Sequence, residues 1–164
     1  MKIFIIAALS ADGFIAKDQA HAATWTSKED KQFFAKKTKE AGVVVMGSNT
    51  YKTIGRPLKE RLNIVYSRQA LIFPDVQVTQ EYPEDLVARL EKQGFGEIAI
   101  IGGAQIYTLF MEAGLVDTLY LSVEPLIFGQ GIPLFTKPLQ TNLSLILQQR
   151  LGEQSLLLEY SVVH

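Results

Sequence analysis

The sequence of 164 residues contains no cysteine and only two histidines, His21 and His164. Without cysteine the protein has no disulfide, no thiolate metal site and no cysteine nucleophile, a composition typical of a reducing compartment. One histidine lies in a polar stretch and the other is the last residue. The sequence therefore offers almost no histidine for a metal site or for a Ser-His-Asp triad. We therefore expect no bound metal.

The sequence also lacks an excess of charge of one sign and long apolar segments. The 16 basic and 17 acidic residues give a formal net charge of -1, so the overall charge gives no reason to expect binding to nucleic acid or to an anionic membrane. No stretch approaches the ~20 apolar residues of a membrane span. The apolar run at residues 2–9 is short and is soon followed by Asp12, which favours a buried first strand over a signal peptide. These features predict a cytoplasmic protein.

What the sequence does contain is enough apolar material for a substantial core. Hydrophobic residues make up 48% and charged residues 20% of the chain, the proportions of a folded globular protein. There is no repeat and no proline-rich or serine-rich linker, and the length is that of one domain. We predict a single domain over residues 1–164, and a monomer. The single tryptophan, Trp25, stands beside a polar stretch, and we interpret it as a core residue.

Strand-like apolar runs alternate with helix-like segments along the chain. Residues 143–150 and 155–163 flank Gly152-Glu153 and are typical of a β-hairpin. This order predicts an α/β fold with a central mixed sheet, mostly parallel, with an antiparallel C-terminal strand and helices on both faces. We expect the other strands at residues 2–9, 43–46, 62–67, 76–79, 98–101 and 117–124, and helices that begin near Thr26, Gly47, Pro83 and Ala104.

The first expected helix carries a candidate functional carboxylate. Thr26 and Glu29 have the spacing of a capping box with Thr26 as the N-cap, and Gly42 ends the helix. Asp30 and Phe34 are four residues apart, so the carboxylate shares a helix face with an aromatic side chain. A carboxylate directed towards apolar surroundings is a candidate binding or catalytic group, although an acid in the first turn also serves the helix dipole.

Two corners between a strand and a helix are rich in small residues, Gly47-Ser48-Asn49-Thr50 and Gly102-Gly103-Ala104-Gln105. Unpaired N–H groups at a helix start attract anions, and glycine lets a ligand approach closely. Neither corner has Walker or Rossmann spacing, so an ordinary turn is the alternative. Arg61 near a strand start is a candidate partner for a carboxylate, and Ser67-Arg68 at a strand end for a second anion.

Taken in order, these motifs resemble the dihydrofolate reductase family over nearly the whole chain. Two other segments, Ser10-Ala11-Asp12-Gly13 and residues 124–135, are more similar to the riboflavin-pathway reductases of the same superfamily. The motifs that resemble dihydrofolate reductases are Ala7-Ala8-Leu9 with Asp12 and Ile15; Trp25, Asp30, Phe34 and Thr38; Val45-Met46-Gly47 with Thr50-Tyr51; Ile54-Gly55-Arg56-Pro57-Leu58; Arg61 to Val65 with Ser67-Arg68; Ile101 to Tyr107; and Leu119 to Ser122.

The resemblance implies that NADPH reduces 7,8-dihydrofolate to tetrahydrofolate by direct hydride transfer, a reaction that needs orientation and one proton route. It assigns catalytic roles to Asp30, which binds the pteridine and assists protonation at N5, to its hydroxyl partner Ser122, and to Tyr107 beside the hydride path. The implied substrate residues are Ile6, Ala7, Lys31, Phe34, Ile54, Leu58, Arg61 and Ile101. The implied cofactor residues are Ala8, Ile15, Gly47, Ser48, Asn49, Thr50, Tyr66, Ser67, Arg68, Ile101, Gly102, Gly103, Ala104, Gln105, Ile106 and Tyr107. The resemblance also implies a cis peptide between the two glycines at 102 and 103.

Three positions depart from the family pattern and keep alternatives open. Ser48 and Gln105 stand where many relatives have basic residues for the adenosine phosphates, so the preference for NADPH over NADH is open. Lys31 stands where an apolar residue usually faces the substrate. The alternative activities are a riboflavin-pathway type of reduction, acting on a ribosylaminopyrimidine phosphate, and nucleotide binding without turnover.

Overall fold

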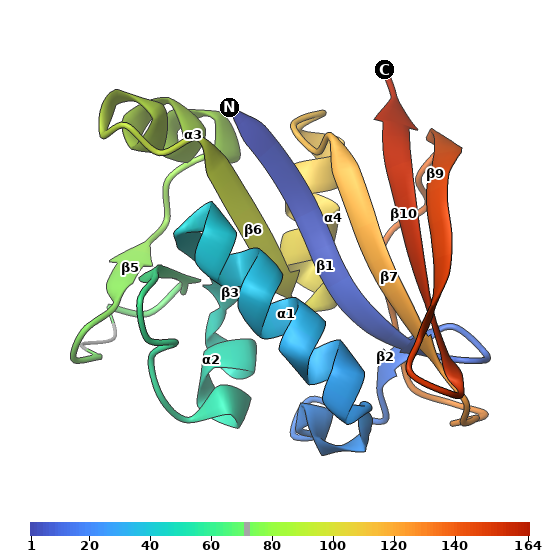
Figure 1. Ribbon diagram of the computed structural model, residues 1–164. Coiled ribbons are helices and arrows are strands. Elements are labelled where there is room, and N and C mark those ends of the chain that lie inside the picture. The colour runs from blue at the N-terminus through green and yellow to red at the C-terminus, as the bar shows by residue number, and fades with distance from the viewer. Residues whose placement is uncertain (71–72) are drawn as a thin grey trace.

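The computed structural model describes residues 1–70 and 73–164, and its centre is an eight-stranded sheet with helices on both faces (Figure 1). The strand order is β5-β4-β3-β6-β1-β7-β10-β9; the first six strands pair in parallel, and β10 pairs antiparallel with both β7 and β9. The predicted fold class is therefore confirmed. The strands of this sheet are β1 (Lys2–Ser10), β3 (Val43–Gly47), β4 (Leu62–Tyr66), β5 (Gln77–Thr79), β6 (Glu97–Gly102), β7 (Thr118–Glu124), β9 (Asn142–Leu151) and β10 (Ser155–Val163).

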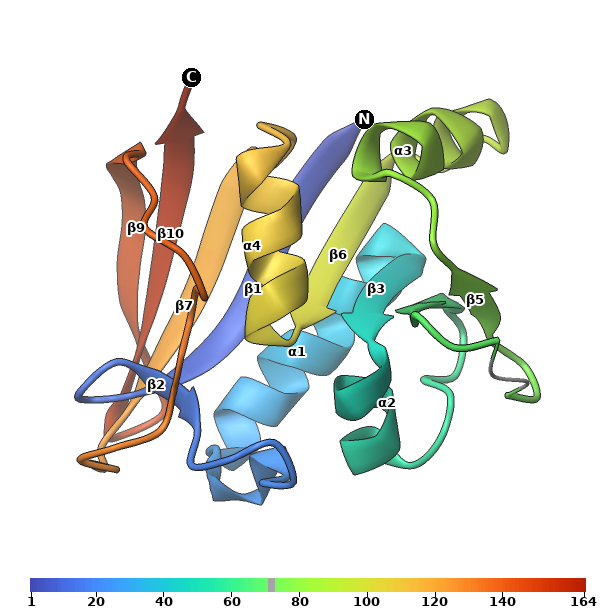
Figure 2. The same ribbon diagram turned by 180° about the vertical axis from the view of Figure 1, so that it is seen from behind.

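The helices lie on opposite sides of the sheet. Helix α1 (Lys28–Ala41) covers one face, and α4 (Ala104–Glu112) covers the other, as the two views in Figures 1 and 2 show. Helix α3 (Pro83–Lys92) packs on the α4 side, where its leucines join the same apolar cluster as Phe110. A short helix, α2 (Ser48–Ile54), follows β3, and a 3-10 turn, η1 (Ala23–Trp25), precedes α1. None of the helices in residues 1–70 and 73–164 is long and apolar enough to cross a membrane.

The core has two layers because the central strand β1 is covered on both faces. Ile3 and Ile5 point into the cluster under α4, whereas Phe4 and Ile6 point into the cluster under α1. Phe4 and Ile5 are completely buried. A strand enclosed on both sides reads as a continuous apolar run rather than an alternating one, which is why residues 2–9 could be assigned from sequence.

The start of α1 differs from the prediction by one residue. The N-cap is Ser27, not Thr26, and its hydroxyl accepts a hydrogen bond from the Asp30 backbone N–H at 3.1 Å. Both residues have a capping hydroxyl, but Ser27 is also held by Glu124 of β7, which accepts from its backbone N–H and its hydroxyl. A tertiary contact therefore decides at which residue the helix begins. At the other end, Gly42 closes the helix in the left-handed conformation, as predicted (φ 74°).

Parallel pairing brings the carboxyl ends of β1, β3, β4 and β6 to one edge of the sheet (Figure 1). Helix α2 and turn η1 lie at this edge, together with a separate two-stranded sheet of β2 (Phe14–Ala16) and β8 (Ile132–Pro133). In open α/β sheets, ligands bind at this edge. The fold thus places the expected site at the lower end of the molecule in Figure 1.

Candidate active site

A cleft of about 1270 Å³ opens at the carboxyl ends of the strands. It runs from the end of β1 and the start of α1 to the ends of β4 and β5, and the segment from Ile15 to Thr26 borders it. The residues expected in the site from the sequence that line this cleft are Ile6, Ala7, Ala8, Ile15, Asp30, Lys31, Phe34, Gly47, Ser48, Asn49, Thr50, Ile54, Leu58, Tyr66, Ser67, Arg68, Ile101, Gly102, Gly103, Ala104, Gln105, Ile106 and Tyr107.

Two expected site residues, Ser122 and Arg61, do not line the cleft. Ser122 is buried, and its hydroxyl acts on Asp30 by lowering the pKa of that carboxyl group. Arg61 instead donates from Nη1 to the Thr38 hydroxyl at 2.7 Å and from Nε to the Lys59 carbonyl at 2.8 Å. Part of its guanidinium is thus already engaged by the protein.

Asp30 is the buried carboxylate of the cleft, with only 8% of its surface exposed. Burial raises its pKa above the ordinary aspartate value, and the negative charge of Glu124 adds to this rise. Hydrogen bonds from the Ser122 and Thr26 hydroxyls and the charge of Lys31 act in the opposite direction, without cancelling the effect of burial. The result is a carboxyl group that holds its proton to higher pH than an exposed aspartate.

Tyr107 connects α4 to the floor of the cleft. Its hydroxyl donates to the backbone carbonyl of Ile6 at 2.9 Å, and the residue is 3% exposed. Burial, together with the nearby Asp30 charge, raises the pKa of this phenol. The side chain therefore stays a neutral hydrogen-bond donor.

The corner between β6 and α4 has backbone geometry in which side chains would interfere. The Gly102–Gly103 peptide is cis, as the family resemblance implies, and Gly102 has a φ of 128°. A Cβ at Gly102 would lie 3.3 Å from the Tyr107 hydroxyl, and one at Gly103 would lie 3.4 Å from the Thr50 hydroxyl. Glycine at both positions leaves the backbone accessible at the start of α4.

The second corner, between β3 and α2, packs against the first. A Cβ at Gly47 would lie 3.2 Å from Cγ1 of Ile106 and 3.9 Å from the backbone nitrogen of Gly103. The two corners thus lie next to each other with no room for a side chain at Gly47, which fits the backbone-lined sides of a narrow cleft. The first turn of α4 carries N–H groups without helical acceptors, which favour an anion at this position.

The far end of the cleft, beyond β4 and β5, has both polar and aromatic groups. Tyr66 lines it, and the Tyr66 hydroxyl is buried without a partner among the residues that the structure describes. Ser67 is buried, and Arg68 is exposed beside it. Glu81 also lines this end, but Arg89 neutralises its charge with two hydrogen bonds of 2.8 and 3.0 Å.

Three features of the cleft were missed by the sequence interpretation. Trp25 is half-buried and lines the cleft rather than filling the core, and within the described chain its Nε1 is buried without a partner. His21 stacks on it, with the ring centroids 6.3 Å apart. Thr26, assigned as an N-cap, is buried, its hydroxyl donates to the Ala23 carbonyl at 3.4 Å, and it lowers the pKa of Asp30; Glu124 lies behind the site. Two adjacent hydroxyl residues, Thr26 and Ser27, can each cap a helix, and this pair could have indicated that Thr26 is free for another role. No sequence feature indicated the position of Glu124.

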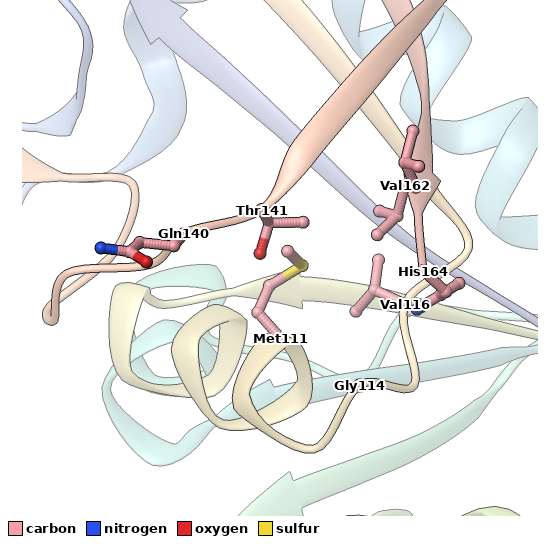
Figure 3. A pocket seen from close by; sticks show the side chains of 8 residues that line it. Met111, Gly114, Val116, Gln140, Thr141, Val162 and His164 are labelled. Carbon is pink, nitrogen blue, oxygen red and sulfur yellow. The ribbon is translucent and has the colours of Figure 1, made fainter.

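A second cavity, of about 120 Å³, lies at the opposite end of the molecule near the C-terminus. Figure 3 shows Met111 of α4 and Val162 of β10 around it, together with Val116 and Thr141. The cavity is too small for a dinucleotide or a folate. Within residues 1–70 and 73–164, no group of three or more histidine, aspartate or glutamate side chains is arranged to hold a metal ion.

Comparisons with known proteins agree with this architecture. The family model described as "Dihydrofolate reductase" matches residues 2–125. A putative dihydrofolate reductase from Caenorhabditis elegans is 34% identical over 139 residues, which cover 74% of this chain and 70% of the relative.

Two solved structures share the fold. A putative riboflavin biosynthesis protein from a Shewanella species has a TM-score of 0.83 at 20% identity, with full coverage of both chains. The Enterococcus faecalis dihydrofolate reductase, solved as a complex with NADP(H), has a TM-score of 0.75 at 23% identity and covers 98% of this chain and 96% of its own. At these identities the likeness concerns the fold.

Proposed function

Because the chain belongs to the dihydrofolate reductase family, we propose that it reduces 7,8-dihydrofolate to tetrahydrofolate with NADPH as the hydride donor. The observation that carries the proposal is the position of Asp30, a buried carboxyl group on the inner wall of a cleft large enough for both molecules. A carboxyl group can form hydrogen bonds with the polar edge of an aminopyrimidine-type ring. The pteridine of dihydrofolate contains such a ring.

The other acidic residues of the cleft support this choice. Asp18 is exposed to solvent, and Glu81 is paired with Arg89. Asp30 combines access to the cleft with burial and a raised pKa. A perturbed, buried group in a large cleft is the expected location of the chemistry.

The walls next to Asp30 suit a folate. Phe34, Ile54 and Leu58 are half-buried apolar residues that line the same cleft, and they can enclose an aromatic ring and exclude water from it. Lys31 and Arg56 are exposed and line the cleft beside these residues, where they can attract carboxylates.

The residues present also fit a nicotinamide dinucleotide. The cradle of Gly47, Gly102 and Gly103, which a Cβ would fill, gives room for the diphosphate at the start of α4. Ser67-Arg68 would hold a 2′-phosphate, and the Tyr66 hydroxyl, which has no partner among the described residues, would face the adenosine end. Ala8 and Ile15 would enclose the nicotinamide, whose bound form supplies the hydride.

The role of the protein in the reaction is orientation, exclusion of water and control of one proton. When bound, the dinucleotide would supply the hydride that C6 of the pteridine takes up, and N5 would take up one proton. Asp30 binds the ring and retains a proton to higher pH than an exposed aspartate. Tyr107, which stays neutral, holds the Ile6 carbonyl at the cleft floor.

A riboflavin-pathway type of reduction is the second candidate. It is favoured by Lys31 and Arg56, because these exposed cations at the cleft could also bind the phosphate of a ribosylaminopyrimidine. The aminopyrimidine ring of that substrate would use Asp30 in the same way. The two candidates therefore differ in the tail of the substrate and not in the group that anchors its ring.

The test is to follow NADPH oxidation with dihydrofolate and, separately, with a ribosylaminopyrimidine phosphate. Asp30→Asn is compared with Asp85→Asn, which alters an exposed acid in the first turn of another helix, α3. Loss of the catalytic carboxyl should reduce kcat with dihydrofolate by about 10²–10⁴-fold, whereas the Asp85 variant should match the wild type.

Each outcome separates the alternatives. Turnover of the pyrimidine alone would replace the first candidate with the second. Turnover of neither substrate, despite NADPH binding, would favour a nucleotide-binding protein. Equal activity of Asp30→Asn and the wild type would mean that Asp30 serves the helix dipole alone.

A further inference from the structure

Behind the cleft lies a second buried carboxylate that the reaction described above does not use. Glu124 is the last residue of β7 and is only 2% exposed. It stands two positions after Ser122, so both side chains point to the same face of the sheet, the one covered by α1. The Ser122 hydroxyl and the Glu124 charge both act on the pKa of Asp30, so Glu124 lies close to the group proposed to anchor the substrate ring.

Glu124 is held by three hydrogen bonds from two other parts of the chain. Its Oε1 accepts from the backbone N–H of Ser27 at 3.1 Å and from the Ser27 hydroxyl at 3.0 Å. Its Oε2 accepts from the hydroxyl of Ser155, at the start of β10, at 2.7 Å. A carboxylate that only accepts hydrogen bonds is satisfied in its charged form.

Ser27 links Glu124 directly to Asp30. The same hydroxyl that donates to Glu124 accepts from the backbone N–H of Asp30 at 3.1 Å. Ser27 is the N-cap of α1, and Asp30 is the third residue of that helix. Any shift of Glu124 is therefore passed through one hydroxyl to the turn that carries Asp30.

We propose that Glu124 is a positioning residue for Asp30, which it fixes through the N-cap Ser27 and to which it presents a second buried negative charge. The proposal rests on the proposed function in that it concerns the same proton. Two nearby carboxylates do not both ionise easily. The charge of Glu124 thus helps Asp30 to keep its proton, while Ser27 keeps the helix start in place.

The other groups around Asp30 do not supply the negative charge that Glu124 provides. Lys31 on α1 stabilises the charged carboxylate, as do the Thr26 and Ser122 hydroxyls. Tyr107 approaches from α4 and is neutral. Glu124, on β7, is the acidic neighbour that raises the pKa of Asp30.

The test titrates the side-chain carboxyl of Asp30 by ¹³C NMR in the ligand-free protein, with Asp30→Asn used to assign the signal. Glu124→Gln removes the charge but keeps the shape, because the amide oxygen can accept from Ser27 and the amide N–H₂ can donate to Ser155. The control is Glu159→Gln, which alters a carboxylate of β10 that accepts from Tyr120.

We expect the midpoint of the Asp30 titration to shift to lower pH in Glu124→Gln and to stay at the wild-type pH in Glu159→Gln. An unchanged midpoint in Glu124→Gln would overturn the proposal and leave Glu124 as a structural support. If that variant does not fold, the wild-type titration of Asp30 decides: the influence of a second carboxylate gives a two-step curve, and a one-step curve would contradict it.

A second readout connects the inference to turnover. The decrease of kcat at high pH, where Asp30 loses its proton, should begin at lower pH in Glu124→Gln, with little change in KM below that range. If Glu124 had a purely structural role, Glu124→Gln would change KM and stability, but kcat would begin to decrease at the same pH as in the wild type. If the wild type does not reduce dihydrofolate, the proposed function fails, but the NMR midpoints still decide the role of Glu124.

Discussion

Replacement of Tyr107 by phenylalanine tests whether its hydroxyl supports the floor of the cleft. The hydroxyl donates to the Ile6 carbonyl at 2.9 Å in a 3% exposed environment. Tyr107→Phe keeps the ring and its packing but leaves a buried acceptor without this donor, which costs about 1–3 kcal/mol. Taking about 2 kcal/mol, and about 2–4 °C per kcal/mol for a chain of this size, we expect Tm to fall by about 4–8 °C.

Tyr66→Phe is the matched control, because the Tyr66 hydroxyl is buried but has no partner among the described residues. Removal of an unsatisfied buried hydroxyl should leave the stability unchanged or increase it. Urea unfolding followed by circular dichroism gives the free energy of unfolding of each variant, with an m value equal to that of the wild type. A loss in Tyr66→Phe equal to or greater than that in Tyr107→Phe would refute the reasoning.

Three further substitutions give separate expectations. Because burial raises the pKa of Asp30, the stability it contributes is present at low pH and is lost as pH rises through its folded pKa; Asp30→Asn should therefore gain stability over the wild type in urea at neutral pH and lose this advantage below about pH 4. Ser27→Ala removes the N-cap and one donor to Glu124, so its free energy of unfolding in urea should fall by at least about 1 kcal/mol. Gly47→Ala places a Cβ 3.2 Å from Ile106, and calorimetry should show a loss of about 1 kcal/mol, whereas an unchanged Tm would mean that the two corners can move apart.

The sheet was predictable from sequence because its strands have strong local signals. The run at residues 2–9 is apolar on both faces, and it forms the central strand β1. Gly42 and the pair Gly152-Glu153 mark a helix end and a hairpin turn, because glycine adopts the left-handed conformation that both positions require. Local chemistry thus fixed these elements, and the family resemblance added the cis peptide after Gly102.

The parts that were missed depend on contacts between distant residues. Thr26 and Ser27 have similar capping ability, and a carboxylate 97 positions further along the chain decides between them. The substrate-binding role of Arg61 stays a prediction, but the contact of its guanidinium with the Thr38 hydroxyl could not be predicted from the sequence. Glu124 follows an ordinary strand pattern, and nothing in its neighbours indicates that it lies behind Asp30. Such relations exist only once the sheet has formed.

The most direct test of the central claim is isotope transfer. The protein is incubated with dihydrofolate and NADPH that is fully deuterated at C4 of the nicotinamide, and the mass of the product is determined. The account predicts tetrahydrofolate that carries one deuterium at C6, formed at a rate about 10²–10⁴-fold lower in Asp30→Asn. Absence of deuterated tetrahydrofolate with the wild type, or an Asp30→Asn variant that forms it equally fast, would contradict the account.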